Sequence, residues 1–292
     1  MEVLLAVGAA LSYGMSDFAG GSLTRRTHVL VVFLLSQLVS FAVLLAAVIV
    51  AAGAVSGSGL SWGAAAGLAG VAGTSLLYQG LAIGRMSVVA PITGVLSAGL
   101  PVLFGLAAGE RPGLAALVGI VLGMAAVPVI TRARDPAPAR TTADPDGRAA
   151  VQAAARSRQA VMCALGAGVG FALFYILLAR SPADSGMWPM LGTRVSIVAA
   201  LGLLVAVRGL PVRVPAGTGL RLAGLGIINT LADLLFLLAT RGGLLSLVAV
   251  ITSLYPGVTV ALAAVVLREP IARWQLAGLG VAAASVALIA LG

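Results

Sequence analysis

The stretch that decides the fold is Asn229–Pro270, NTLADLLFLLATRGGLLSLVAVITSLYPGVTVALAAVVLREP. It contains two apolar runs joined by a short turn that carries Arg241. The first run encloses a single carboxylate, Asp233, and the second contains Pro256 and stops at Glu269. Each run is long enough to cross about 30 Å of hydrocarbon as a helix. The stretch therefore predicts two membrane-spanning helices connected by a tight turn.

The same plan occurs earlier in the chain, from Ser75 to Pro112. Offsets of 158 and 159 residues align small, hydroxyl and acidic residues of the first half with those of the second. The aligned pairs include Gly8 with Gly166, Ser75 with Asp233, Ser87 with Ser246, Ala90 with Ala249, Thr93 with Thr252 and Glu110 with Glu269. We infer that the chain consists of two similar halves.

The composition points to a membrane protein. The chain is 60% hydrophobic and 9% charged, with a mean hydropathy of +1.11. A water-soluble fold of 292 residues cannot bury that much apolar surface. The net charge of +9 comes from basic residues scattered between apolar runs, and no basic face accompanies it, so we expect no nucleic-acid partner. The only cysteine, Cys163, lies in an apolar run, which excludes an intramolecular disulfide.

Ten apolar runs are long enough to span a bilayer. The first lacks a basic leader and is expected to be a retained span, not a cleaved signal peptide. Glycines spaced four apart, as at Gly63 and Gly67, predict close helix packing. The predicted spans are 3–22, 29–52, 62–83, 87–108, 113–131, 160–180, 187–207, 219–240, 244–267 and 272–291.

One connection differs from the other, short ones. Residues 132–158 are polar, with three prolines, six arginines and three aspartates, which predicts a flexible linker. It separates a first five-helix repeat (1–131) from a second (159–292). Because each repeat has an odd number of spans, the second enters the membrane from the opposite side. The predicted fold is an all-α integral membrane protein with ten transmembrane helices in two inverted-topology five-helix repeats.

These patterns resemble the drug/metabolite transporter superfamily, and specifically its EamA-type ten-span transporters. The resemblance is carried by SYGMSDFAGG near the start, by the small-residue, Ser, Pro and terminal acid pattern at 82–112 and 239–270, and by LGTRVSIVAALGLLVAV at 191–207. The sequence departs from the family pattern at Pro91 and at Gln37, where an Arg is expected opposite Arg194. The resemblance implies a transporter with both termini in the cytoplasm.

The charge distribution favours the other orientation. If the termini are cytoplasmic, the loops on that side hold only Arg111, Arg180 and Arg241, whereas 14 arginines lie on the opposite side. The positive-inside rule therefore favours termini outside. The sequence leaves the orientation open.

Three charged residues lie in the interior of predicted spans, away from the span ends, where such side chains are costly and usually functional. Asp233 is the leading candidate for substrate binding or proton coupling, with a structural pair to Arg194 as the alternative. Asp17 is a second candidate for both roles, or an interfacial carboxylate neutralised by a neighbouring arginine. Arg194 is expected to form a structural ion pair.

Other residues are candidates by position and chemistry. An aromatic lining with few polar anchors suits a small amphipathic ligand, although each residue could equally pack between helices. Prolines within spans are expected to kink them or take part in gating. Glu110 and Glu269 are expected to mark interfacial turns, with a gating role as the alternative. The further candidate binding residues are Tyr13, Ser75, Tyr78, Gln79, Tyr175, Asn229, Phe236, Thr252 and Tyr255, and the candidate kinks are Pro91, Pro101 and Pro256.

We expect a secondary active transporter of the plasma or inner membrane that moves a small metabolite by alternating access. The expected central cavity is lined by spans 1, 3, 4, 6, 8 and 9. An amino acid or related amphipathic solute is the first candidate, with export favoured by resemblance and proton coupling as a further hypothesis. The alternatives are transport of cationic drug-like or quaternary ammonium compounds, and, in another class, a membrane-embedded enzyme or lipid-handling scaffold. We expect no enzyme activity, cofactor or metal, since the only histidine lies in a loop and no nucleotide-binding loop is present. The expected partners are the substrate and the lipid bilayer, and the protein is expected to be a monomer or weak homodimer.

Overall fold

The computed structural model describes residues 1–23, 28–51, 54–84, 86–131, 148–212, 217–266, 268 and 272–291. This part of the chain is helical, with ten helical segments long and apolar enough to cross a membrane. The predicted all-α, ten-span fold is confirmed. The helices are α1 (Glu2–Leu23), α2 (Val29–Ala51), α3 (Gly57–Ile83), α4 (Met86–Ala107), α5 (Leu114–Thr131), α6 (Arg148–Ala179), α7 (Trp188–Val207), α8 (Gly219–Gly242), α9 (Leu245–Ser253), α10 (Tyr255–Val266) and α11 (Arg273–Leu291), with a short 3₁₀ turn at Ala183–Ser185.

Two predicted boundaries differ from the structure. The predicted span 244–267 is divided into α9 and α10 at Leu254, next to Pro256, which has no backbone N–H to continue a helix. Helix α6 begins at Arg148, so residues 148–158 of the predicted linker are helical. Alanine-rich sequence favours helix there despite its polar composition. The rest of that linker, 132–147, lies outside the described residues.

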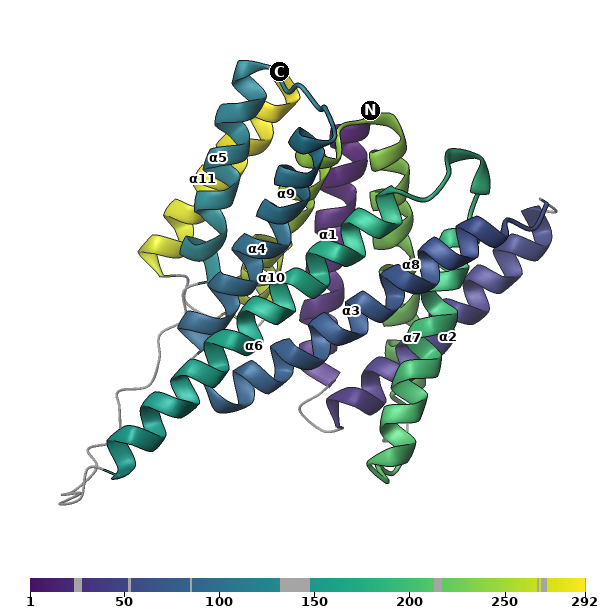
Figure 1. The fold of residues 1–292 in the computed structure, drawn as a ribbon, viewed down its shortest axis with the longest axis horizontal. Coiled ribbons are helices and arrows are strands. Elements are labelled where there is room, and N and C mark those ends of the chain that lie inside the picture. Colours follow the sequence, from purple (N-terminus) through teal and green to yellow (C-terminus); the bar gives the residue numbers. More distant parts are fainter. Residues whose placement is uncertain are drawn as a thin grey trace.

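The packing of the helices has an internal two-fold pattern. If α1 to α5 are exchanged with α6, α7, α8, the α9–α10 pair and α11, the most extensive helix contacts find their counterparts. Helix α3 packs on α6 and α7, while α8 packs on α1 and α2; α4 packs on α6, and α10 and α9 pack on α1. The exchanged helices α2 and α7 contact each other, as do α5 and α11. Both termini lie at the upper edge in Figure 1, and α6 begins at the opposite edge.

Glycine allows the closest of these contacts. A Cβ added at Gly63 would lie 1.8 Å from the carbonyl oxygen of Pro189, and one at Gly67 would lie 2.6 Å from the carbonyl oxygen of Thr193. The backbones of α3 and α7 therefore touch, because neither glycine has a side chain to separate them. The Thr193 hydroxyl donates a hydrogen bond of 3.0 Å to the carbonyl of Gly63 in the same place. The pairs Gly119–Gly123 and Gly166–Gly170 also lie at helix contacts, as predicted.

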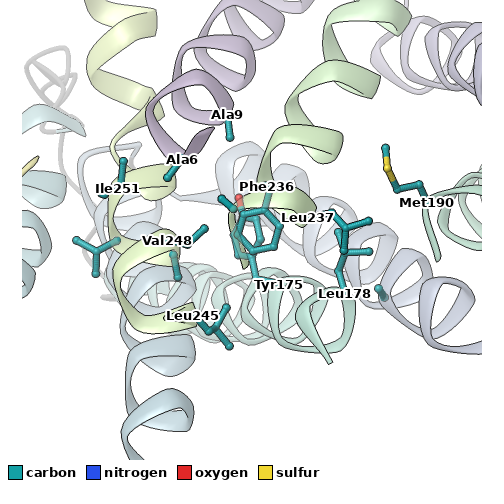
Figure 2. Close-up of a cluster of buried hydrophobic side chains, with 14 of the residues drawn as sticks. Ala6, Ala9, Tyr175, Leu178, Met190, Phe236, Leu237, Leu245, Val248 and Ile251 are labelled. Atoms are coloured by element: carbon teal, nitrogen blue, oxygen red, sulfur yellow. The ribbon is translucent and has the colours of Figure 1, made fainter. Parts of the chain in front are cut away.

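The largest buried apolar cluster lies where helices from both halves meet near the end that carries the termini. Figure 2 shows its centre, with the ring of Phe236 against that of Tyr175. We use the name apolar seal for the part of this cluster formed by Leu178, Met190, Phe236, Leu237, Leu245 and Val248, all of them less than 9% exposed. Helices α6 and α8 contribute residues near their ends, and α7 and α9 near their beginnings, so the seal closes one end of the bundle.

Candidate functional site

A cavity of about 440 Å³ lies between the two halves. Helices α1, α2, α3, α4, α6, α7, α8 and α10 all contribute to its lining. The sequence led us to expect spans 1, 3, 4, 6, 8 and 9 only, so α2 and α7 correct that expectation. They were missed because their inward residues are mostly apolar. Eight of the sequence candidates line the cavity: Tyr13, Asp17, Tyr78, Tyr175, Arg194, Asn229, Asp233 and Tyr255.

The cavity is off-centre along the bundle. Its lining takes residues 13–20 of α1, 29–37 of α2, 70–78 of α3 and 225–233 of α8. Since α1 and α3 run away from the end with the termini, and α2 and α8 run back, these segments lie toward the opposite end. The apolar seal lies on the other side of the cavity. The structure thus has a polar cavity displaced toward the linker end and a closed end that carries the termini.

An ion pair stands at the inner wall of the cavity. The Arg194 Nη2 atom donates to Asp233 Oδ2 at 2.5 Å, and the two side chains are 3% and 7% exposed. The Tyr13 hydroxyl donates to the other carboxylate oxygen of Asp233. Arg194 Nη1 donates to Gln37 Oε1 at 2.6 Å, while its Nε is buried without a hydrogen-bond partner among the described residues. This network joins α1, α2, α7 and α8.

Helix packing explains why Gln37 and Arg194 meet. They occupy equivalent positions of the two halves, on α2 and α7, and these helices contact each other at the pseudo-two-fold axis. Two arginines facing each other there would repel, so glutamine opposite Arg194 removes a like-charge contact. Helix α2 is held against α8 by the Ser40 hydroxyl, which donates to the carbonyl of Gly226 at 2.6 Å.

The two aspartates of the cavity have different surroundings. Asp233 has a positive partner and a hydroxyl donor, so its charge is balanced within the wall. Asp17 lines the same cavity, is exposed to it, and has no hydrogen bond or ion pair among the described residues. The sequence ranked Asp233 first as the acid available to a substrate. The geometry favours Asp17, because its carboxylate oxygens are free to accept hydrogen bonds.

Aromatic side chains surround Asp17. All four tyrosines of the chain line the cavity, together with three phenylalanines. The rings of Tyr13 and Tyr255 have centroids 6.3 Å apart. Helix α10 can come this close to α1 because residue 14 is a glycine. A Cβ added at Gly14 would lie only 2.7 Å from the carbonyl oxygen of Tyr255. The three phenylalanines are Phe33, Phe171 and Phe174.

Four sequence candidates lie outside the lining of the cavity. The cavity face of α3 holds Gly70, Thr74, Leu77 and Tyr78, and Ser75 and Gln79 follow about 100° beyond it on the helix. Phe236 is fully buried in the apolar seal, with its ring centroid 4.7 Å from that of Tyr175. Thr252 is also fully buried, in α9, and its hydroxyl lacks a hydrogen-bond partner within the described residues.

The prolines behave in two ways. Helix α4 continues through Pro91 and Pro101 without a break. Pro256 is the second residue of α10, directly after the break at Leu254, a position near a helix start where its missing N–H costs little. Glu110 does mark a turn after α4, and its carboxylate accepts hydrogen bonds from α9. Glu269 lies outside the described residues.

Sequence reasoning missed several polar lining residues. Gln37 was noted only as a departure from a family pattern. Small hydroxyl residues are common in membrane helices as packing residues, so their sequence context carries no functional signal. The missed polar residues are Ser16, Ser36, Gln37, Thr74 and Ser97.

Comparison with known proteins bears on this fold and this site. Residues 158–291 match the EamA-like transporter family. A solved crystal structure, titled only as the crystal structure of a protein, is 19% identical, with a TM-score of 0.76 over 99% of this chain and 97% of that one. At this identity it supports the fold alone. Among curated proteins no match was found. The second half of the chain is thus similar to the EamA-like transporter family, and the ten apolar helices of the described residues are those of a multi-pass membrane protein.

Proposed function

We propose that this protein is a secondary active transporter that moves a small amphipathic solute with a protonated amine by alternating access. The observation that carries the proposal is the carboxylate of Asp17, which faces an aromatic cavity without a partner among the described residues. An unpaired carboxylate within a membrane span is costly and is expected to have a cationic ligand or a proton during the cycle. The membrane is expected to be the plasma or inner membrane.

The charge balance of the cavity supports a cationic ligand. Its described charged lining residues are Asp17, Arg194 and Asp233. The charges of Arg194 and Asp233 cancel in their ion pair, which leaves one negative charge at Asp17. Tyrosine and phenylalanine rings add cation–π attraction of about 0.5–2 kcal/mol each when they face a desolvated cation. The volume of about 440 Å³ lies within the range of small-molecule sites.

The charge balance of the cavity also ranks the two substrate classes that the sequence left open, organic cations and amino acids. A monovalent organic cation needs only Asp17 and the rings. The carboxylate of an amino acid needs a donor as well, and both terminal nitrogens of Arg194 already have acceptors. Neutral donors such as Asn229 and the hydroxyls of the tyrosines other than Tyr13 remain for it. We therefore place amine-bearing cations first and amino acids second.

The same residues bear on proton coupling, and the resemblance to the family bears on the direction of transport. Asp17 is favoured over Asp233 for proton coupling, because a free carboxylate can alternate between a proton and an ammonium group whereas Asp233 is held by Arg194. Export is favoured by the resemblance to the family.

Transport in proteoliposomes tests the proposal. A radiolabelled, membrane-impermeant ammonium cation, tetraethylammonium, serves as the probe, with alkylammonium compounds and amino acids as competitors. We expect uptake driven by an imposed pH gradient, stronger competition by the ammonium compounds, and loss of gradient-driven flux in Asp17→Asn. Asp184→Asn is the matched control, because Asp184 is exposed and lies outside the cavity. Equal flux of Asp17→Asn and the parent protein under the same pH gradient would overturn the assignment of Asp17.

A further inference from the structure

Glu110 joins the two halves of the protein at the closed end. It follows the turn after α4, and its Oε1 and Oε2 atoms accept hydrogen bonds of 2.7 and 3.0 Å from the backbone N–H groups of Leu245 and Ser246. These residues begin α9, where the backbone N–H groups have no partner within the helix. A carboxylate is also favoured at a helix N-terminus by the helix dipole. A first-half acid thus binds the N-terminus of a second-half helix.

The backbone around Glu110 leaves room for this contact. A Cβ added at Gly105 would lie 2.4 Å from Glu110 Oε2, so any side chain at that position would displace the carboxylate. Gly109 has a φ of +100°, a conformation that residues other than glycine rarely adopt. Two glycines before Glu110 therefore aim its carboxylate at α9.

The position of this contact connects it with the cavity. Leu245 belongs to the apolar seal, and neither Glu110 nor the first residues of α9 line the cavity. At its other end α9 stops at Ser253, and Tyr255 beyond the break lines the cavity. Helix α9 is thus a short element that has the Glu110 contact at one end and the cavity wall near the other. For this end of the bundle to open, the end of α4 and the start of α9 must separate.

We propose that Glu110 is a gate clamp: its two hydrogen bonds to α9 hold the end that carries the termini closed, and they break when that end opens during transport. The inference rests on the proposed alternating-access function. The repeat supports it, because the residues aligned with Glu110, Leu245 and Ser246 at an offset of 159 are Glu269, Met86 and Ser87, so the residues of the clamp recur in the other half of the sequence.

Cysteine labelling in oriented membrane vesicles tests the clamp. Thr74→Cys, which lines the cavity, is introduced into a Cys163→Ala background and treated with a membrane-impermeant maleimide from either face. In the parent, we expect labelling from the linker face. Glu110→Ala and Gly105→Ala should increase the labelling rate from the face of the termini on the order of tenfold, because each removes charge-assisted hydrogen bonds from the closed end. Labelling from the linker face should fall in parallel.

Two controls separate the clamp from nonspecific effects. Asp184→Asn removes an exposed carboxylate from the same end, and Gly202→Ala adds a methyl group where no described atom lies within 4 Å. Both should label like the parent. If Glu110→Ala does not fold, Glu110→Gln, which keeps one acceptor oxygen, should give the same direction of change. Unchanged labelling in folded Glu110 and Gly105 variants would overturn the clamp.

The labelling needs no substrate, so its outcome is independent of the transport assay. A shift in labelling without flux of any probe would support the clamp and count against the proposed substrate class. Flux with unchanged labelling would count against the clamp alone.

Discussion

Replacing Asp233 by leucine should destabilise the protein far more than its small change in volume suggests. The substitution leaves the guanidinium of Arg194, 3% exposed, without a counterion. Arg194→Met leaves the carboxylate of Asp233 buried with only the Tyr13 hydroxyl as a donor. In either single variant an uncompensated charge remains in a site with little access to water.

The expected magnitude follows from the nature of the pair. Breaking a buried ion pair by removing one partner costs about 3–5 kcal/mol, whereas replacing both partners by apolar residues is often close to neutral. Each single variant should therefore lose about 3–5 kcal/mol of stability, while the double variant Asp233→Leu/Arg194→Met should lose roughly 0–2 kcal/mol. The coupling energy of the cycle is then at least about 4 kcal/mol, well above the values found for exposed pairs.

Thermal unfolding of the purified protein in detergent measures this cycle. By the scaling for globular domains, each single variant should lower the melting temperature by roughly 10 °C, and the double variant by much less. Asp184→Asn is the control for loss of an exposed carboxylate and should stay within about 0.5 kcal/mol of the parent. If the double variant loses as much as both single variants together, the two side chains are not coupled and the reasoning is refuted.

Two further predictions concern packing. Gly63→Ala should destabilise the protein by at least about 2 kcal/mol, because its new methyl group meets the backbone of Pro189. Gly202→Ala should have no such effect, and equal melting temperatures of the two variants would contradict the contact between α3 and α7. Phe236→Ala should cost about 3–5 kcal/mol of stability, because it leaves a cavity in the apolar seal. Phe33→Ala, on the wall of the polar cavity, should cost clearly less in the same thermal assay. The reverse order would show that the seal is not tightly packed.

The sequence by itself determined the number and approximate position of the spans and the two-fold repeat. A helix that crosses hydrocarbon must satisfy its backbone internally and needs about 20 apolar residues, and both requirements are local. The ten runs and the role of Gly63 and Gly67 could therefore be predicted. The boundary at Arg148 and the break at Leu254 could not, because helix ends depend on neighbouring packing as well as on local composition.

The tertiary structure alone decided which ionisable side chain is free. Asp233 has its partners 39 and 220 residues away in the chain, at Arg194 and Tyr13, whereas Asp17 has none among the described residues. Membrane helices are apolar on most of their circumference, so their sequences give little indication of which side chains will face each other. The same holds for the contact of Glu110 with α9. Partners far apart in sequence meet only when the helices have docked, and docking of these helices depends on glycine contacts and hydrogen bonds between them.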